Sequence, residues 1–137
     1  MKKIRFLKLK KFKRKSGTLV PINFNKKFPI KVKRIFYIYG KKNSARGDHA
    51  HKKLTQIFIP IFGTTKLIVT KNGLEKNYIL DYKKNKAILV PPMIWCRLEF
   101  IKKNSIILVA CNDTYKFSDY IETLKEFKNL EKKIWIY

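Results

Sequence analysis

The chain alternates short apolar runs with turn residues along most of its length. Runs of about five to eight residues, rich in Ile, Val, Tyr and Phe, are separated by turns, of which Asn72-Gly73 is the strongest hairpin signal. This spacing predicts an all-β sandwich or barrel. The predicted strands are Ile4–Phe12, Thr18–Asn23, Val32–Tyr39, Asp48–Phe62, Thr64–Thr70, Leu74–Leu80, Ala87–Val90, Trp95–Ile101 and Ser105–Cys111.

The pattern changes after residue 111, where the apolar positions recur at helical rather than alternating spacing. Ser118 and Asp119 are residue types that cap helix amino termini. One short amphipathic helix is therefore predicted near the carboxyl end. Its apolar positions are Tyr120, Ile121, Leu124, Phe127 and Leu130.

The length of 137 residues predicts a single domain spanning residues 1–137. No run approaches about 18 uninterrupted apolar residues, and charged residues interrupt the amino terminus early, so we expect neither a membrane span nor a secretory signal. The expected location is cytoplasmic. Cys96 and Cys111 lie in apolar runs without metal-type spacing, which predicts buried, reduced thiols.

The net charge of +24 first suggests a polyanionic partner such as a nucleic acid. However, only 5 of the 33 cationic residues are Arg, whereas Arg is the residue that grips phosphates and base edges bidentately. The abundance of Lys, Ile and Asn is also what A/T-rich codons would produce. We therefore expect a generally basic surface that attracts small anions, and no dedicated nucleic-acid partner.

Both histidines of the chain lie in one short segment, as His49 and His51. On a strand they share one face, because side chains alternate with period two. Two imidazoles that titrate near neutral pH suit proton transfer, and they would equally suit a metal ion. Both alternatives are open on this evidence alone.

The His-x-His pair resembles the first motif of the cupins, in which two His and a Glu bind a metal ahead of a Gly. The spacing from His51 to Gln56 and then to Gly63 matches, but an amide stands in place of the acid. The Pro-containing segment 91–97, where cupins carry a further His, holds none. A pair of imidazoles falls short of the usual three protein ligands, so we expect no bound metal.

Further motifs lie along about residues 16–127: Tyr37-Ile38-Tyr39-Gly40, Arg46-Gly47-Asp48-His49-Ala50-His51-Lys52-Lys53 with Gln56, Pro92-Met93-Ile94-Trp95, and Asp119-Tyr120-Ile121. Together they resemble a narrower family, the nucleotide-sugar 3,4-ketoisomerases. The resemblance implies a metal-free cupin jelly-roll barrel, usually a homodimer that exchanges amino-terminal strands, without a cofactor. It also implies a dTDP-linked keto sugar, dTDP-4-keto-6-deoxy-D-glucose, as substrate.

The implied reaction needs a base, an acid or shuttle for the oxygens, and donors for a developing oxyanion. A hydrogen on a hydroxyl-bearing carbon beside a ketone is acidic, so its removal gives an enediol, and reprotonation at the neighbouring carbon moves the ketone. We assign His51 as the base at C3 and His49 as the shuttle, with the reverse order open. Tyr37 is the candidate phenolic donor. The candidate substrate-binding residues are Arg46, Gln56, Trp95 and Arg97.

Other functions remain open at this stage. A nucleotide-sugar 3,5-epimerase would use similar residues and leave the ketone in place. A sugar-nucleotide sensor without activity, or a nucleic-acid binder that exploits the positive surface, would need no catalysis. The configuration of the product at C4 is also open, because it depends on which face of the enediol is protonated.

Overall fold

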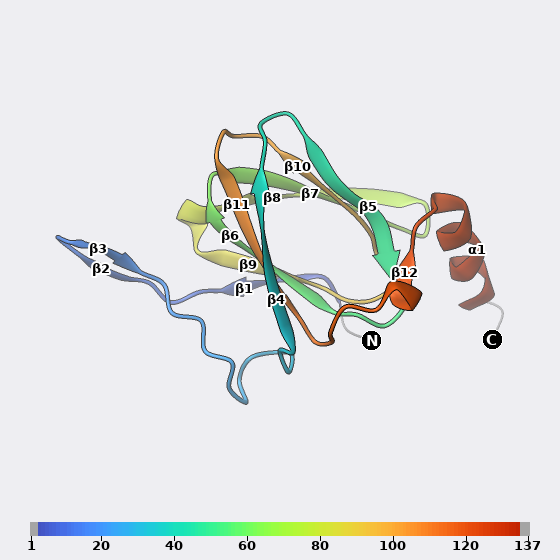
Figure 1. The fold of residues 1–137 in the computed structure, drawn as a ribbon, viewed down its shortest axis with the longest axis horizontal. Coiled ribbons are helices and arrows are strands. Elements are labelled where there is room, and N and C mark those ends of the chain that lie inside the picture. Colours follow the sequence, from blue (N-terminus) through green and yellow to red (C-terminus); the bar gives the residue numbers. More distant parts are fainter. Residues whose placement is uncertain (1–2, 135–137) are drawn as a thin grey trace.

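A computed structural model describes residues 3–134, which form two five-stranded antiparallel sheets packed face to face (Figure 1). The first sheet has the order β1 (Arg5–Lys8), β9 (Lys86–Val90), β6 (Gln56–Phe62), β11 (Ser105–Cys111), β4 (Arg34–Gly40). The second has the order β12 (Tyr120–Ile121), β5 (Ala45–His51), β10 (Trp95–Phe100), β7 (Thr64–Lys71), β8 (Leu74–Asp81).

Three further elements lie outside the two sheets. The hairpin of β2 (Phe12–Arg14) and β3 (Gly17–Leu19) projects away from the barrel, whereas the helix α1 (Leu124–Ile134) lies beside β12 at the other end (Figure 1). Two 3₁₀ turns, Tyr82–Lys84 and Phe117–Asp119, precede β9 and β12. This arrangement confirms the predicted all-β fold with one short C-terminal helix.

The core fills the space between the two sheets. Alternate residues of the facing strands point into it, as Phe58 does from β6, Leu67 and Val69 from β7, and Ile107 and Val109 from β11. Side chains that pack in this way remove apolar surface from water, which is the main favourable contribution to folding.

The outer faces of the sheets are also partly covered. Ile57 and Ile59 of β6 point outward, where residues 7, 9, 22 and 28 of the amino-terminal segment cover them. Because β6 is buried on both faces, it is a continuous apolar run rather than an alternating one. On the second sheet, Phe127 of α1 is fully buried against Ala50 and Ile121.

Three predicted strands end earlier or break where the sequence pattern is continuous. The predicted strand Ile4–Phe12 ends at Lys8, and Phe12 begins β2. The predicted strand Thr18–Asn23 ends at Leu19. The predicted strand Asp48–Phe62 divides into β5 and β6, because residues 52–55 leave the sheet and carry backbone N–H groups that bond to the side chains of Asp119 and Asn112.

The predicted helix start is wrong. The helix begins at Leu124, and the Thr123 hydroxyl accepts a hydrogen bond from the Glu126 backbone N–H at 3.2 Å. Tyr120 and Ile121 belong to β12 instead, because they pair with β5. The Asp119 carboxylate accepts its hydrogen bonds from the segment after β5, so it does not cap a helix.

Among the helices of residues 3–134, none is long and apolar enough to cross a lipid bilayer.

Candidate active site

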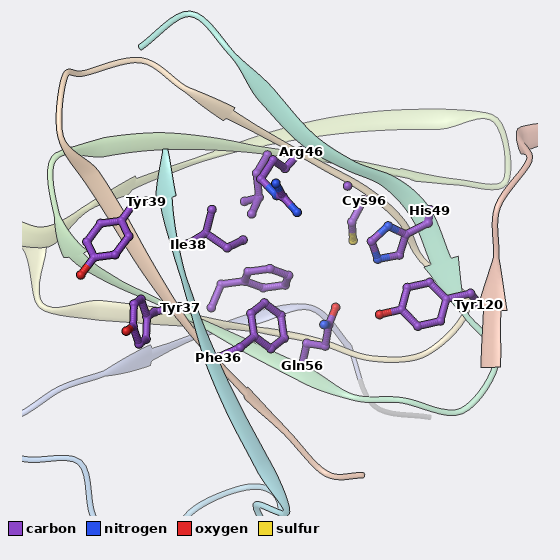
Figure 2. A pocket seen from close by; sticks show the side chains of 12 residues that line it. Phe36, Tyr37, Ile38, Tyr39, Arg46, His49, Gln56, Cys96 and Tyr120 are labelled. Carbon is purple, nitrogen blue, oxygen red and sulfur yellow. The ribbon is translucent and has the colours of Figure 1, made fainter. Parts of the chain in front are cut away.

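A cavity of about 450 Å³ lies between the two sheets, among β4, β5, β6, β10 and β12 (Figure 2). Its volume falls in the range of about 300–1,000 Å³ that is usual for small-molecule sites. Its walls combine apolar and polar groups, as ligand sites commonly do. The lining residues are Phe36, Tyr37, Ile38, Tyr39, Arg46, Gly47, His49, Gln56, Phe58, Cys96, Leu98 and Tyr120.

A β-bulge in β5 brings Arg46 and His49 to the same wall of this cavity. His49 pairs with Cys96 and Gly47 with Arg97, so Asp48 is an extra residue with no partner on β10. Asp48 and Gly47 both have positive φ angles, 59° and 98°, as such an irregularity requires. Without the extra residue, Arg46 and His49 would point to opposite faces.

The two imidazoles lie side by side, as the alternation along β5 predicts. The ring centroids of His49 and His51 are 5.0 Å apart, with the ring planes nearly perpendicular. The ring of Tyr120 contacts both, at 5.0 Å from His49 and 4.4 Å from His51. In Figure 2 the hydroxyl of Tyr120 is directed into the cavity, across from Gln56.

His51 is held by a carboxylate behind it. Its Nδ1 lies 3.1 Å from Oδ2 of Asp119, whose two oxygens also accept hydrogen bonds from the backbone N–H groups of Lys53 and Leu54. A carboxylate that already accepts two hydrogen bonds acts as an acceptor again here, so Nδ1 of His51 carries the hydrogen. The other nitrogen, Nε2, is then an acceptor. It is buried and has no hydrogen-bond partner.

Burial keeps both imidazoles neutral. Desolvation, together with the neighbouring His49, lowers the pKa of His51 to about 4 against the opposing effect of Asp119. Desolvation also lowers the pKa of His49, although its hydrogen bond with the Gly47 backbone and the charge of Asp48 work in the other direction. Neutral imidazoles at physiological pH can accept protons, which is what a general base must do.

Gln56 and Arg46 line the cavity as predicted. Gln56 is buried on the floor beside Phe36, with its amide nitrogen 3.9 Å from the Sγ of Cys111. Figure 2 shows the Arg46 side chain entering from the opposite wall. These two residues present an amide and a guanidinium to whatever occupies the cavity, and both groups can bind oxygen atoms.

The structure does not bring Tyr37 to the histidines. Phe36 and Ile38 of β4 point into the barrel, so Tyr37 and Tyr39 between them point outward. The Tyr37 side chain is 61% exposed and packs edge-on against Tyr39 at 5.4 Å. It borders the cavity along β4, but its hydroxyl is directed away from His49 (Figure 2).

Trp95 and Arg97 lie on the opposite face of β10 from the cavity. Cys96 and Leu98 line the cavity, so the residues that alternate with them face out. The Trp95 ring packs at 5.8 Å from the Phe127 ring of α1. The Nε of Arg97 lies 3.5 Å from Glu99 at the surface. The structure therefore places neither predicted binding residue in the cavity.

Comparison with known proteins identifies the family. A family model described as "FdtA: WxcM-like, C-terminal" matches residues 2–132. The chain is 32% identical over 119 residues to the TDP-4-oxo-6-deoxy-alpha-D-glucose-3,4-oxoisomerase of Aneurinibacillus thermoaerophilus. The aligned residues cover 86% of this chain and 85% of that protein. The chain belongs to the FdtA family.

Solved structures agree with this FdtA assignment. QdtA, a sugar 3,4-ketoisomerase from Thermoanaerobacterium thermosaccharolyticum solved in complex with TDP, is 28% identical, with a TM-score of 0.89 over 96% of both chains. WlaRA, a TDP-fucose-3,4-ketoisomerase from Campylobacter jejuni, is 32% identical, with a TM-score of 0.84 over 96% of this chain and 98% of that one. The predicted cupin-type fold and the predicted isomerase family are confirmed.

Two residues at the site of this FdtA-family chain, Asp119 and Tyr120, were not predicted from the sequence. Both belong to the Asp119-Tyr120-Ile121 motif, but the helical spacing of the apolar positions led to their placement on a helix. Because Tyr120 pairs directly with His51 across β12 and β5, the two side chains lie on the same face of the sheet, where Tyr120 and His49 line the cavity and His51 lies buried beside them. The signal was present in the motif, and only its secondary structure was misread.

The donor groups around the imidazoles are a poor match for a metal ion. Within residues 3–134, no three His, Cys, Asp or Glu side chains are grouped as metal ligands usually are. One nitrogen of His51 is occupied by Asp119, and the nearby Gln56 offers an amide rather than a carboxylate. Three protein ligands are the usual minimum for a catalytic zinc or iron.

Proposed function

We propose that this protein converts dTDP-4-keto-6-deoxy-D-glucose to a dTDP-3-keto-6-deoxyhexose by metal-independent proton transfer through an enediol. The observation that carries the proposal is the buried Nε2 of His51, an unpaired proton acceptor directly behind the cavity and beside His49, the imidazole that lines it. Such a pair suits a reaction in which hydrogens move between adjacent carbons and oxygens, and no electrons leave the sugar.

His51 is the proposed base at C3. Its Nδ1–H bond to Asp119 fixes the tautomer, so the lone pair lies on Nε2. Nε2 takes the hydrogen from C3 as a proton, the electron pair of that bond forms the C3–C4 double bond, and the carbonyl pair moves to the oxygen on C4. Return of the proton to C4 completes the carbon part of the reaction. Asp119 stabilises the imidazolium formed in between.

His49 is the proposed shuttle for the hydroxyl protons. It is neutral at physiological pH because burial lowers its pKa, and it lies directly beside His51. A neutral imidazole can take the proton from the hydroxyl on C3 and give it up again within one turnover.

Arg46 and Gln56 are the proposed substrate-binding residues. The Arg46 guanidinium at the cavity wall suits the diphosphate or a sugar oxygen, and the Gln56 amide suits a hydroxyl or carbonyl group. The relative QdtA was solved with TDP, which supports a nucleotide-linked ligand. Trp95 and Arg97 are left out of the proposed site because both face away from the cavity.

The decisive experiment is incubation with dTDP-4-keto-6-deoxy-D-glucose in D₂O, followed by NMR of the sugar product. We expect a ketone at C3, deuterium in the ring, and the same rate with excess chelator. A ketone that stays at C4 with inversion at C3 or C5 would instead identify an epimerase. Binding of the nucleotide sugar without any change in it would instead indicate a sugar-nucleotide sensor without catalytic activity.

We further propose that two copies associate through the hairpin β2–β3 and the edge strand β4. Phe12 and Leu19 on the hairpin are exposed, as are Ile35, Tyr37 and Tyr39 on β4. A lone two-stranded hairpin is marginally stable in water, and an exposed apolar edge strand invites pairing. Strand β1 already pairs with β9 of its own chain, so the hairpin is the proposed exchanged segment.

Size-exclusion chromatography with light scattering tests this association. We expect a dimer of the natural chain and a monomer for the double variant Phe12→Asp, Leu19→Asp. The matched variant Lys11→Gln, Lys13→Gln lowers the net charge by the same two units in the same region and so controls for the change in charge. A monomeric natural chain would refute the association and leave the proposed reaction unaffected.

The proposed product suits one downstream reaction class. A ketone at C3 is the group that an aminotransferase converts to an amine, giving a 3-amino-3,6-dideoxyhexose for a surface glycan. The proposed location is the cytoplasm, since both cysteines are free and buried, as expected in a reducing compartment.

A further inference from the structure

The proposed reaction leaves one requirement that the two imidazoles do not meet by themselves. When the base removes the hydrogen from C3, negative charge develops on the oxygen at C4, and that oxygen must receive a proton. His51 is occupied with the carbon-bound hydrogen, and His49 takes the proton from the other oxygen. A third group that donates a proton is therefore needed in the same part of the cavity.

Tyr120 is the phenol that lies in the right place. Its ring contacts both imidazoles, at 5.0 Å from His49 and 4.4 Å from His51, and it lines the same cavity. Its hydroxyl is directed into the cavity in Figure 2. By contrast, the hydroxyl of Tyr37 is directed away from the histidines.

The surroundings of Tyr120 fix its ring. The backbone is held by pairing with β5, where Tyr120 lies opposite His51. The rings of Tyr115 and Phe117 also lie near it, with centroids at 5.6 and 6.4 Å. Four aromatic neighbours therefore hold the ring while its hydroxyl reaches the cavity. A group fixed in this way donates without a large reorganisation during the reaction.

We propose that Tyr120 is a catalytic residue that donates the proton to the C4 oxygen, the role that the sequence alone assigned to Tyr37. This inference rests on the proposed function. In the first half of the reaction, the carbonyl pair moves to the C4 oxygen, which takes the phenol proton. At the end of this half the sugar is an enediol, which still carries the hydroxyl on C3; His49 takes the proton of that hydroxyl in the second half, when the carbonyl at C3 forms.

The second half of the reaction restores every group. The electron pair of the C3–C4 double bond takes the proton from the His51 imidazolium, so a C–H bond forms at C4. The proton held by His49 passes to the Tyr120 oxygen, and the two rings that exchange it are adjacent. One proton has moved from C3 to C4 and one from the C3 oxygen to the C4 oxygen, so no oxidant or reductant is needed.

The test is the variant Tyr120→Phe, which keeps the ring and removes only the hydroxyl. We expect kcat to fall by about 10²- to 10³-fold, the usual effect of losing one donor to a developing oxyanion, with KM changed by less than about threefold. The matched control is Tyr115→Phe. This variant removes the hydroxyl of an exposed tyrosine whose ring also contacts Tyr120. The kcat of the Tyr115 variant should stay within about threefold of that of the natural chain.

Deuterium exchange separates a chemical role from a structural one. In D₂O, the Phe variant should return more substrate labelled at C3 for each product formed, because the enediolate goes back more often when its oxygen is not protonated. A structural defect would slow exchange and isomerisation together. Near-ultraviolet circular dichroism and the melting temperature of both variants report whether the fold is kept.

The possible outcomes are distinct. If the natural chain isomerises and Tyr120→Phe keeps at least a third of its kcat, the role of Tyr120 is overturned and the proposed function stands. Equal losses in the Tyr120 and Tyr115 variants, or an unchanged ratio of exchange to product, would also overturn it. If the natural chain produces no 3-keto sugar, the proposed function fails and the role of Tyr120 fails with it.

Discussion

The neighbouring strands β5 and β10 present their side chains to the cavity in different ways. On β5 a bulge at Asp48 turns both Arg46 and His49 inward, although they are three residues apart. On β10 the alternation continues through Trp95, so Cys96 lines the cavity and Trp95 faces the helix. A residue at the site is therefore identified by the local register of its strand, and a matching motif alone does not decide it.

Removing the base on the bulged strand should have the largest effect. The variant His51→Gln keeps a polar side chain of similar length but provides no lone pair of comparable basicity at the Nε2 position. We expect kcat to fall by about 10³-fold or more, because general base catalysis contributes about 10²- to 10⁴-fold. Product NMR measures the rate, and circular dichroism checks the fold. A loss of less than tenfold would assign the C3 base to another group.

Asp119→Asn should have the next largest effect, through the tautomer of His51. The Asn carbonyl can still accept from the Lys53 or Leu54 backbone, but its amide hydrogens favour a lone pair on Nδ1 and move the hydrogen to Nε2. We expect kcat to fall by about 10- to 100-fold with little change in KM. Asp113→Asn is the matched control, since Asp113 pairs with Lys116 at the surface.

The pH profile distinguishes this tautomer effect from a change in charge. Because burial lowers the pKa of His51 to about 4, the base is already neutral at pH 7, and activity of the natural chain should persist as the pH falls to about 5. It should be lost as the pH approaches 4, where the imidazole becomes protonated. Loss of the Asp119 charge lowers the pKa further, so raising the pH should not rescue Asp119→Asn. Rescue at high pH would contradict the tautomer argument.

The bulge itself is tested by a pair of glycine substitutions. A Cβ added at Gly47, where φ is +98°, would lie 2.9 Å from the carbonyl oxygen of Cys96, so β5 or β10 must shift. We expect Gly47→Ala to lower kcat/KM by about tenfold and to destabilise the fold by about 1–3 kcal/mol. Gly73 also has a positive φ, +73°, but nothing lies within 4 Å of its added Cβ.

Gly73→Ala therefore isolates the cost of the backbone conformation. It should lower the free energy of unfolding by about 1 kcal/mol and leave kcat/KM unchanged. Urea denaturation and steady-state kinetics on the two variants give both quantities. If Gly47→Ala matches Gly73→Ala in both measurements, the bulge does not set the positions of Arg46 and His49.

The sequence predicted that the two imidazoles lie side by side because this arrangement follows from a local pattern. His49 and His51 are two residues apart on one strand, so alternation with period two places them on one face whatever the rest of the fold is. The strands and the helix were also visible as local periodicities. The breaks in the predicted strands were not, because they depend on Asp119 and Asn112, which are distant in sequence and bond to residues 53–55.

The remaining site residues depend on tertiary pairing that local patterns do not contain. On β4 both faces carry apolar or aromatic residues, so nothing in the sequence shows whether Phe36 or Tyr37 faces inward. The two-residue strand β12 has no periodicity of its own and exists because it pairs with β5. Asp119 and Tyr120 therefore reach the site through a contact nearly 70 residues away in sequence.

The smallest effect on activity is expected on the outer face of β10. Trp95→Leu removes the ring that packs on Phe127, so it should lower the free energy of unfolding by about 2–3 kcal/mol. Because the ring is outside the cavity, kcat/KM should stay within about threefold. Trp95→Phe, which keeps an aromatic contact with α1, should recover most of the stability. A tenfold loss of kcat/KM at unchanged stability would instead place Trp95 against the substrate, and the regular alternation of β10 would no longer separate packing residues from site residues.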